Sequence, residues 1–104
     1  MSKTYAESYM LEGDGGKSNY KKRYAIYAGH QIILFKNQDD KQERGIIDIK
    51  YARMRETVLI CGKLKMNGFI LMARGNRMFF STETLQQQML WLDALRKSCV
   101  LLDI

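Results

Sequence analysis

Short apolar or alternating segments fill most of the chain and are separated by turn residues. The segments are Tyr9 to Leu11, Tyr20 to Ala28, Gln31 to Lys36, Gly45 to Ile49, Val58 to Cys61, Phe69 to Ala73 and Arg77 to Ser81. Their lengths and spacing are typical of an antiparallel β-sheet or barrel. Because proline is absent, the turns are expected at Gly, Asn and Asp residues. The pattern predicts about seven strands, the first beginning near Ser8, and leaves Lys50 to Thr57 ambiguous.

The last fifth of the chain has a helical period instead. Apolar residues follow one another at steps of three or four, at Leu85, Met89, Leu92, Leu95 and Cys99. This spacing predicts one face of an amphipathic helix. Thr84 with Gln87 three residues later is a capping-box pattern, with Ser81 and Thr82 as alternative caps. Trp91 flanks the apolar face and is expected to plug the core, so the helix is predicted to cover an open end or seam of the barrel.

Length and composition are those of one globular domain. The chain has 104 residues, 46% of them hydrophobic and 27% charged. We expect a flexible polar segment over residues 1–7 and a folded domain over residues 8–104. No apolar stretch is long enough to span a membrane, and the N-terminus has no apolar segment of a secretion signal. With only two cysteines, a reducing, cytoplasmic location is predicted.

Enzymatic and metal-binding classes find little support in the residue types. His30 is the single histidine, whereas a zinc site needs three or four nitrogen or sulfur ligands. Cys61 lies in an apolar run, where a buried and unreactive thiol is expected. We therefore predict a protein without catalytic residues, metal or cofactor.

Basic residues exceed acidic ones by 17 to 11, which gives a net charge of +6. Such a surplus favours anionic partners. The densest basic cluster consists of Lys17, Lys21, Lys22 and Arg23, beside a glycine-rich loop. Strand alternation places Lys21 and Arg23 on one face and Lys22 on the other. The cluster is suited to a multiply phosphorylated headgroup. The alternative is that these cations only solvate a strand edge and discourage edge pairing.

Several segments, taken in order, resemble the pleckstrin homology (PH) domain family. Gly15 to Tyr24 resembles the first hairpin of that family, and Asp39 to Ile49 resembles its third loop and fourth strand. Met78 to Thr84, followed by Trp91 to Arg96, resembles its last strand and C-terminal helix. The resemblance covers residues 8–98. It implies two near-orthogonal antiparallel sheets, seven strands in all, capped at one end by the helix.

The resemblance also implies a binding site at the open end of the barrel. Many PH domains bind phosphoinositides there, through a basic residue near the end of strand one and a K/R-x-R motif in strand two. Lys21 and Arg23 match the second part, and Arg44 matches a basic position used by some members. Glu12 occupies the strand-one position, where Lys17 is the nearby basic substitute.

A weak, electrostatic lipid site follows from these matches. Lys22 is expected as a secondary basic contact, and the third-strand segment Ile32 to Phe35 lacks the tyrosine found in tight binders. The predicted function is a non-catalytic signalling module that is recruited peripherally from the cytoplasm to phosphoinositides or anionic membrane surfaces. The alternative is a protein–protein interaction domain with a degenerate lipid site. Nucleic-acid binding is disfavoured, because Tyr20, Tyr24 and Ile26 are predicted to form a core stripe.

Overall fold

The computed structural model describes residues 3–13, 20–61, 64–97 and 100–101. The elements in chain order are β1 (Thr4–Gly13), β2 (Lys21–Ala28), β3 (Gln31–Phe35), β4 (Glu43–Asp48), β5 (Arg53–Cys61), β6 (Leu64–Ala73), β7 (Asn76–Thr82), α1 (Leu85–Arg96) and β8 (Val100–Leu101). The predicted order of seven strands followed by one helix is confirmed. β8 was not predicted.

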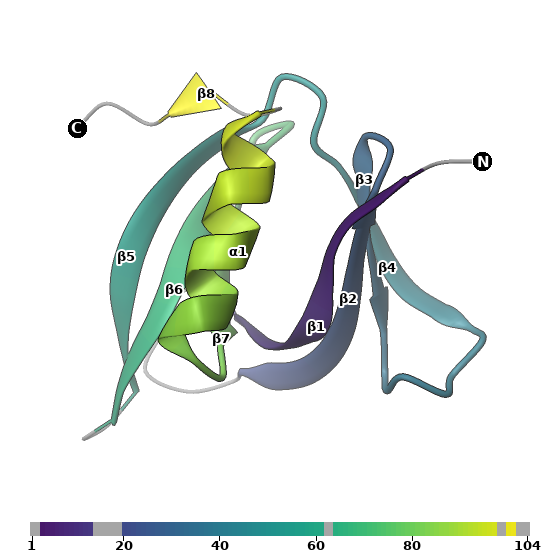
Figure 1. Cartoon of the computed structure of the whole chain (residues 1–104), viewed down its shortest axis with the longest axis horizontal. Helices are drawn as coiled ribbons and strands as arrows, with labels where there is room; N and C mark the ends of the chain where they lie inside the picture. The colour runs from purple at the N-terminus through teal and green to yellow at the C-terminus, as the bar shows by residue number, and fades with distance from the viewer. Residues whose placement is uncertain (1–2, 14–19, 62–63, 98–99, 102–104) are drawn as a thin grey trace.

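The strands form one curled sheet in the order β4-β3-β2-β1-β7-β6-β5-β8. Neighbours are antiparallel, except that β8 runs parallel to β5. β1 pairs with β2 and, through Met10–Gly13, with β7, so it joins two layers. Figure 1 shows β1–β4 in one layer, β5–β7 in the other and α1 across the opening between them. The two predicted sheets are thus halves of one sheet that folds over.

Two strand boundaries differ from the predictions. β1 begins at Thr4 rather than near Ser8, and Ala6 is already buried in the core. A β-bulge between Thr4 and Ala6 interrupts the alternation there. The ambiguous segment 50–57 contains the start of β5, at Arg53. Both strands begin with polar residues, so the hydrophobic pattern did not reveal their first residues. Pairing with a neighbouring strand decides where each strand begins.

Trp91 is the large core residue of the helix, as predicted. It is fully buried and stacks on Tyr27 and Phe69, with ring centroids 6.4 and 6.2 Å away. Its indole Nε1–H donates a hydrogen bond to Ser8 Oγ at 2.9 Å, so its polar atom is satisfied inside the core. This residue therefore joins the helix to β1, β2 and β6.

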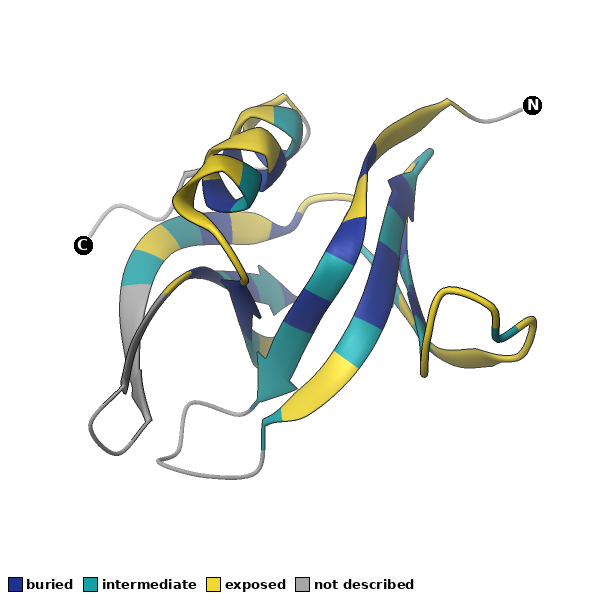
Figure 2. Cartoon of the chain, turned by 60° about the horizontal axis from the view of Figure 1, so that its bottom comes forward, coloured by how far each residue is buried: buried dark blue, intermediate teal, exposed yellow. Residues whose placement is uncertain are grey.

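The buried face of α1 is rotated from the predicted one. Leu85 and Met89 are 55% and 57% exposed, which corrects their assignment to the core; Gln88, Trp91, Leu92 and Leu95 are the buried residues. Gln88 is accommodated because its Nε2 donates to the carbonyl of Gly68 at 2.8 Å. Figure 2 shows the buried side of α1 facing the barrel. The bulk of the indole, together with this bond, determines the rotation of the helix.

The predicted helix cap is confirmed. Thr84 Oγ1 accepts a hydrogen bond from the backbone N–H of Gln87 at 3.1 Å. The side chain of Gln87 returns a bond to the backbone N–H of Glu83 at 3.1 Å, one residue before the usual partner in a capping box.

The core face of β2 also differs from the prediction. Ala25 and Tyr27 are fully buried, whereas Ile26 is partly exposed on the outer face. Tyr24 is buried, but on that outer face, where its ring meets Tyr9 edge-on at 5.0 Å. Its hydroxyl donates to Glu7 Oε2 at 2.6 Å, and this bond is the main cause that raises the pKa of Tyr24 to about 12. The predicted core stripe was therefore on the wrong side of β2.

We expect Gly68→Ala to destabilise the fold. A Cβ at Gly68 would collide with the backbone carbonyl oxygen of Phe80 in the neighbouring strand. β6 and β7 must then move apart next to the hydrogen bond that Gln88 donates to the Gly68 carbonyl. Overpacking of this kind lowers the free energy of unfolding by roughly 1–3 kcal/mol. Urea unfolding followed by Trp91 fluorescence measures this loss. Gly45→Ala is the control, because a Cβ at Gly45 would make only ordinary van der Waals contacts, and its free energy of unfolding should fall less. Gly75 is unsuitable as a control, because its positive φ of 81° would strain an alanine.

Candidate functional site

The basic pair Lys21 and Arg23 lies at the start of β2. The cross-strand partners of these residues are Glu12 and the buried Met10, respectively. Alternation with the buried Ala25 places both cations on the core-facing side of the strand. Lys21 is exposed and Arg23 half-buried, and Figure 2 shows the exposed start of β2. The predicted grouping of these two residues is confirmed by the register.

Neither cation is neutralised by a carboxylate of the described residues. Arg23 Nη1 donates only a long bond of 3.4 Å to the carbonyl of Lys22, and Lys21 forms no ion pair within the described part of the chain. Guanidinium and ammonium donors thus remain available at the start of β2. Phosphate oxygens are the acceptors that such donors bind most strongly.

Glu12 places a negative charge on the same face. It lies near the end of β1 as the cross-strand partner of Lys21, without forming an ion pair with it. Its Oε2 is buried and has no hydrogen-bond partner among the described residues. A carboxylate at this position opposes the approach of a phosphate and weakens any anion site formed by Lys21 and Arg23.

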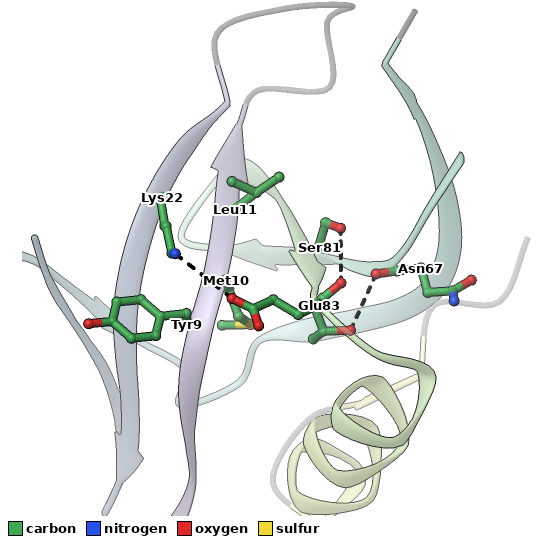
Figure 3. A pocket seen from close by; sticks show the side chains of 8 residues that line it. Tyr9, Met10, Leu11, Lys22, Asn67, Ser81 and Glu83 are labelled. Atoms are coloured by element: carbon green, nitrogen blue, oxygen red, sulfur yellow. Dashed lines mark hydrogen bonds and ion pairs between the residues drawn. The ribbon is translucent and has the colours of Figure 1, made fainter. Parts of the chain in front are cut away.

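Lys22 belongs to a different surface. On the outer face it forms an ion pair with Glu83 at 4.0 Å, and its Nζ lies 4.7 Å from the centre of the Tyr9 ring (Figure 3). It lines a pocket of about 340 Å³ together with Tyr9, Met10, Leu11, Asn67, Ser81, Thr82 and Glu83. Sequence reasoning missed this pocket, because the pairing of β1 with β7 brings its distant segments together.

Arg44 is held by a neighbouring acid. It lies in β4, separated from β2 by β3, and its Nε contacts Asp40 Oδ2 at 3.3 Å. The pKa of the Asp40 carboxyl is lowered, first because the backbone N–H of Gln42 donates to it and also because Arg44 is near. Arg44 thus lies two strands away from Lys21 and Arg23, and its guanidinium is engaged by Asp40.

The remaining sequence-derived candidates are partly outside the described residues. Lys17 and most of the glycine-rich loop lie outside them, as does Cys99, and the side chain of Cys61 is not described either. His30 lies in the β2–β3 turn, as expected. Over residues 3–13, 20–61, 64–97 and 100–101, no group of three or more His, Cys, Asp or Glu is placed to hold a metal ion. None of the described helical segments has the length and hydropathy to cross a membrane.

Comparison with known proteins agrees with the fold. A PH and Rap-GAP domain-containing protein of Dictyostelium discoideum is 27% identical over 90 residues, which are 83% of this chain but 7% of that protein. The crystal structure of the carboxyl-terminal PH domain of pleckstrin superposes with a TM-score of 0.75 at 14% identity, covering 94% of this chain and 98% of that one.

A second structure of that pleckstrin domain is a complex with D-myo-Ins(1,2,3,4,5)P5, and superposes with a TM-score of 0.72 at 14% identity over 93% of this chain and 99% of that one. The PH domain family matches residues 4–100 of this chain. This family is generally non-catalytic and commonly serves in signalling or lipid binding. The family match, the strand order and the C-terminal helix together establish that the chain belongs to the PH domain family.

Proposed function

We propose that this domain is a non-catalytic signalling module that binds phosphoinositide headgroups or an anionic membrane surface at the open end of its barrel. The supporting observation is the placement of Lys21 and Arg23 on the core-facing side of β2, without an ion pair to any described carboxylate. A guanidinium that binds one phosphate through two hydrogen bonds, next to an ammonium group that attracts a second, is suited to phosphates on adjacent carbons of an inositol ring. Lys17 and Arg44 are proposed as further contacts and Lys22 as a secondary one. To reach an anion, Arg44 has to leave Asp40 and Lys22 has to leave Glu83.

The expected affinity is modest. Each basic residue near an anionic leaflet contributes about 1 kcal/mol, and this attraction weakens over a Debye length. The negative charge of Glu12, on the same face, repels the membrane surface and lowers this attraction. The pleckstrin domain solved with an inositol pentakisphosphate supports the view that this fold can hold a phosphorylated inositol. Recruitment is therefore proposed to be peripheral, reversible and sensitive to salt, from a cytoplasmic pool.

We expect the double variant Lys21→Ala/Arg23→Ala to lose roughly thirtyfold in vesicle affinity, because two contributions of about 1 kcal/mol are removed. Cosedimentation with phosphatidylserine vesicles, with and without phosphoinositides, measures it at low and high salt. The matched control is Arg53→Ala/Arg77→Ala. These exposed arginines lie on the outer face of the other layer, on either side of Met72, and their removal changes net charge equally.

The outcomes separate two functions. If only the Lys21→Ala/Arg23→Ala variant loses vesicle affinity, the result supports a site at the open end. If the Arg53→Ala/Arg77→Ala control loses as much affinity, the result supports a diffuse electrostatic surface. Absence of wild-type pelleting at low salt contradicts lipid binding. It would favour the second candidate, a protein–protein interaction domain, whose specific support is the acid Glu12 at the position where lipid-binding relatives carry a base.

A further inference from the structure

Strand β4 ends the sheet, and no described strand pairs with its outer backbone edge. β3 is the only described element with which it makes extensive contact, and Figure 1 shows it remote from α1 and β5. The backbone N–H of Ile49 donates to the carbonyl of His30 at 2.9 Å, so Ile49 and Ile47 direct their backbone groups toward β3. By alternation, the N–H and C=O groups of Ile46 and Asp48 point away from the sheet. Such an edge is a template for another strand.

A row of isoleucines runs across the outer face to this edge. Ile26 is the cross-strand partner of Ile33, and Ile33 is the partner of Ile46. They lie opposite the buried face formed by residues such as Ile32. Ile26 and Ile33 are partly covered, but Ile46 is 50% exposed, because no further strand follows it. The last isoleucine of the row, Ile46, is therefore left exposed at the sheet edge.

Charges on either side of Ile46 are self-complementary. Arg44 precedes it by two residues and Asp48 follows it by two. Arg44 is the extra residue where the β3–β4 register shifts, between Glu43 and Gly45. Counted along the chain, an antiparallel copy centred on Ile46 sets Arg44 beside Asp48 of the second copy, twice. Two neighbouring two-fold registers are poorer: an axis at Ile47 places Arg44 opposite Lys50, and an axis at Asp48 places two aspartates opposite each other.

We propose that β4 pairs antiparallel with β4 of a second copy of this chain, about a two-fold axis at Ile46. Pairing of the free N–H and C=O groups and contact between the two Ile46 side chains supply the affinity, and the isoleucine row continues from one copy into the other. This self-association does not depend on the lipid-binding function proposed above.

The charged residues set the register and add little energy. In the single copy Arg44 contacts Asp40 at 3.3 Å, and Asp48 accepts from Arg74 at 2.7 Å. Exchanging or sharing exposed ion pairs changes stability little, whereas like charges held face to face are unfavourable. The ionised state of Asp48 is secured, because the Lys50 backbone N–H and Arg74 lower the pKa of its carboxyl.

Sedimentation velocity over a wide concentration range, without lipid, tests the proposal. The wild-type chain should pass from monomer to dimer as concentration rises. Ile46→Lys should weaken this association by about tenfold or more, because two ammonium groups meet at the axis. Leu90→Lys is the matched control, since Leu90 on α1 is equally exposed at 51% and lies away from β4. It should dimerise like the wild type.

Charge complementation tests the register itself. In a dimer of the Arg44→Glu variant, the new glutamate would face Asp48 of the other copy. In a dimer of the Asp48→Lys variant, the new lysine would face Arg44. Because like charges repel, each variant alone should stay monomeric. An equimolar mixture restores opposite charges at both positions and should form a heterodimer, which also shows that both variants are folded. A wild-type chain that stays monomeric throughout overturns the proposal. So does an Ile46→Lys variant that dimerises as tightly as the wild type, or a mixture that fails to associate.

Discussion

Glu12→Lys is expected to raise affinity for phosphoinositide vesicles by roughly tenfold to a hundredfold. One charge-assisted contact is worth about 1.5–3 kcal/mol, which corresponds to that range in affinity. Glu12 lies opposite Lys21 on the core-facing side of the open end, beside the pair that we propose to bind phosphate. The substitution removes a repulsive charge and adds a donor at the same position. It also removes a buried carboxylate oxygen without a partner among the described residues, which offsets part of the cost of setting two lysines opposite each other.

The measurement is vesicle cosedimentation at fixed phosphatidylserine, with rising phosphoinositide content. Asp93→Lys is the control, because Asp93 is an exposed acid on α1 and its replacement makes the same change in net charge. Glu12→Gln should give an intermediate affinity, since repulsion is removed without a new donor. If Asp93→Lys gains as much as Glu12→Lys, bulk charge governs binding and the open end is not a defined site.

Trp91→Ala should lower the free energy of unfolding by about 3–5 kcal/mol. For a domain whose total stability is about 5–15 kcal/mol, this loss is large enough to leave a substantial unfolded fraction. The reason is geometric: the indole is fully buried, stacks on Tyr27 and Phe69, and donates to Ser8 Oγ. Its removal leaves a cavity between α1 and the sheet, as well as a hydroxyl without its donor.

Urea unfolding followed by circular dichroism measures this change, because the variant lacks the only tryptophan. Leu90→Ala, at the preceding position of the same helix, is half-exposed and should lose no more than about 0.5 kcal/mol. Trp91→Phe should fall between the two, since it keeps a ring but not the N–H. Equal losses in Trp91→Ala and Leu90→Ala would contradict the role of Trp91 as the joint between helix and barrel.

The sequence predicted the site less completely than the fold. Alternation alone grouped Lys21 with Arg23 and separated Lys22, because the side-chain period of a strand is two. It did not show that Arg44 is held by Asp40, or that Lys22 is engaged by Glu83 and Tyr9. These partnerships join different elements, or depend on how a loop turns back on a strand. The spacing of charges along the chain carries no such information.

Periodicity by itself determined the element order, the Thr84 cap and the burial of Trp91, because each depends on local spacing or on the size of one side chain. Only the tertiary structure decided which faces those elements bury. Tyr24 and Ile26 lie outside while Ala25 and Tyr27 fill the core, and Met89 is exposed where Gln88 is buried. When both faces of a strand or helix carry apolar residues, the pattern cannot choose between them. The choice is made by the neighbours, such as the Gly68 carbonyl that accepts from Gln88 and the aromatic rings that stack on Trp91.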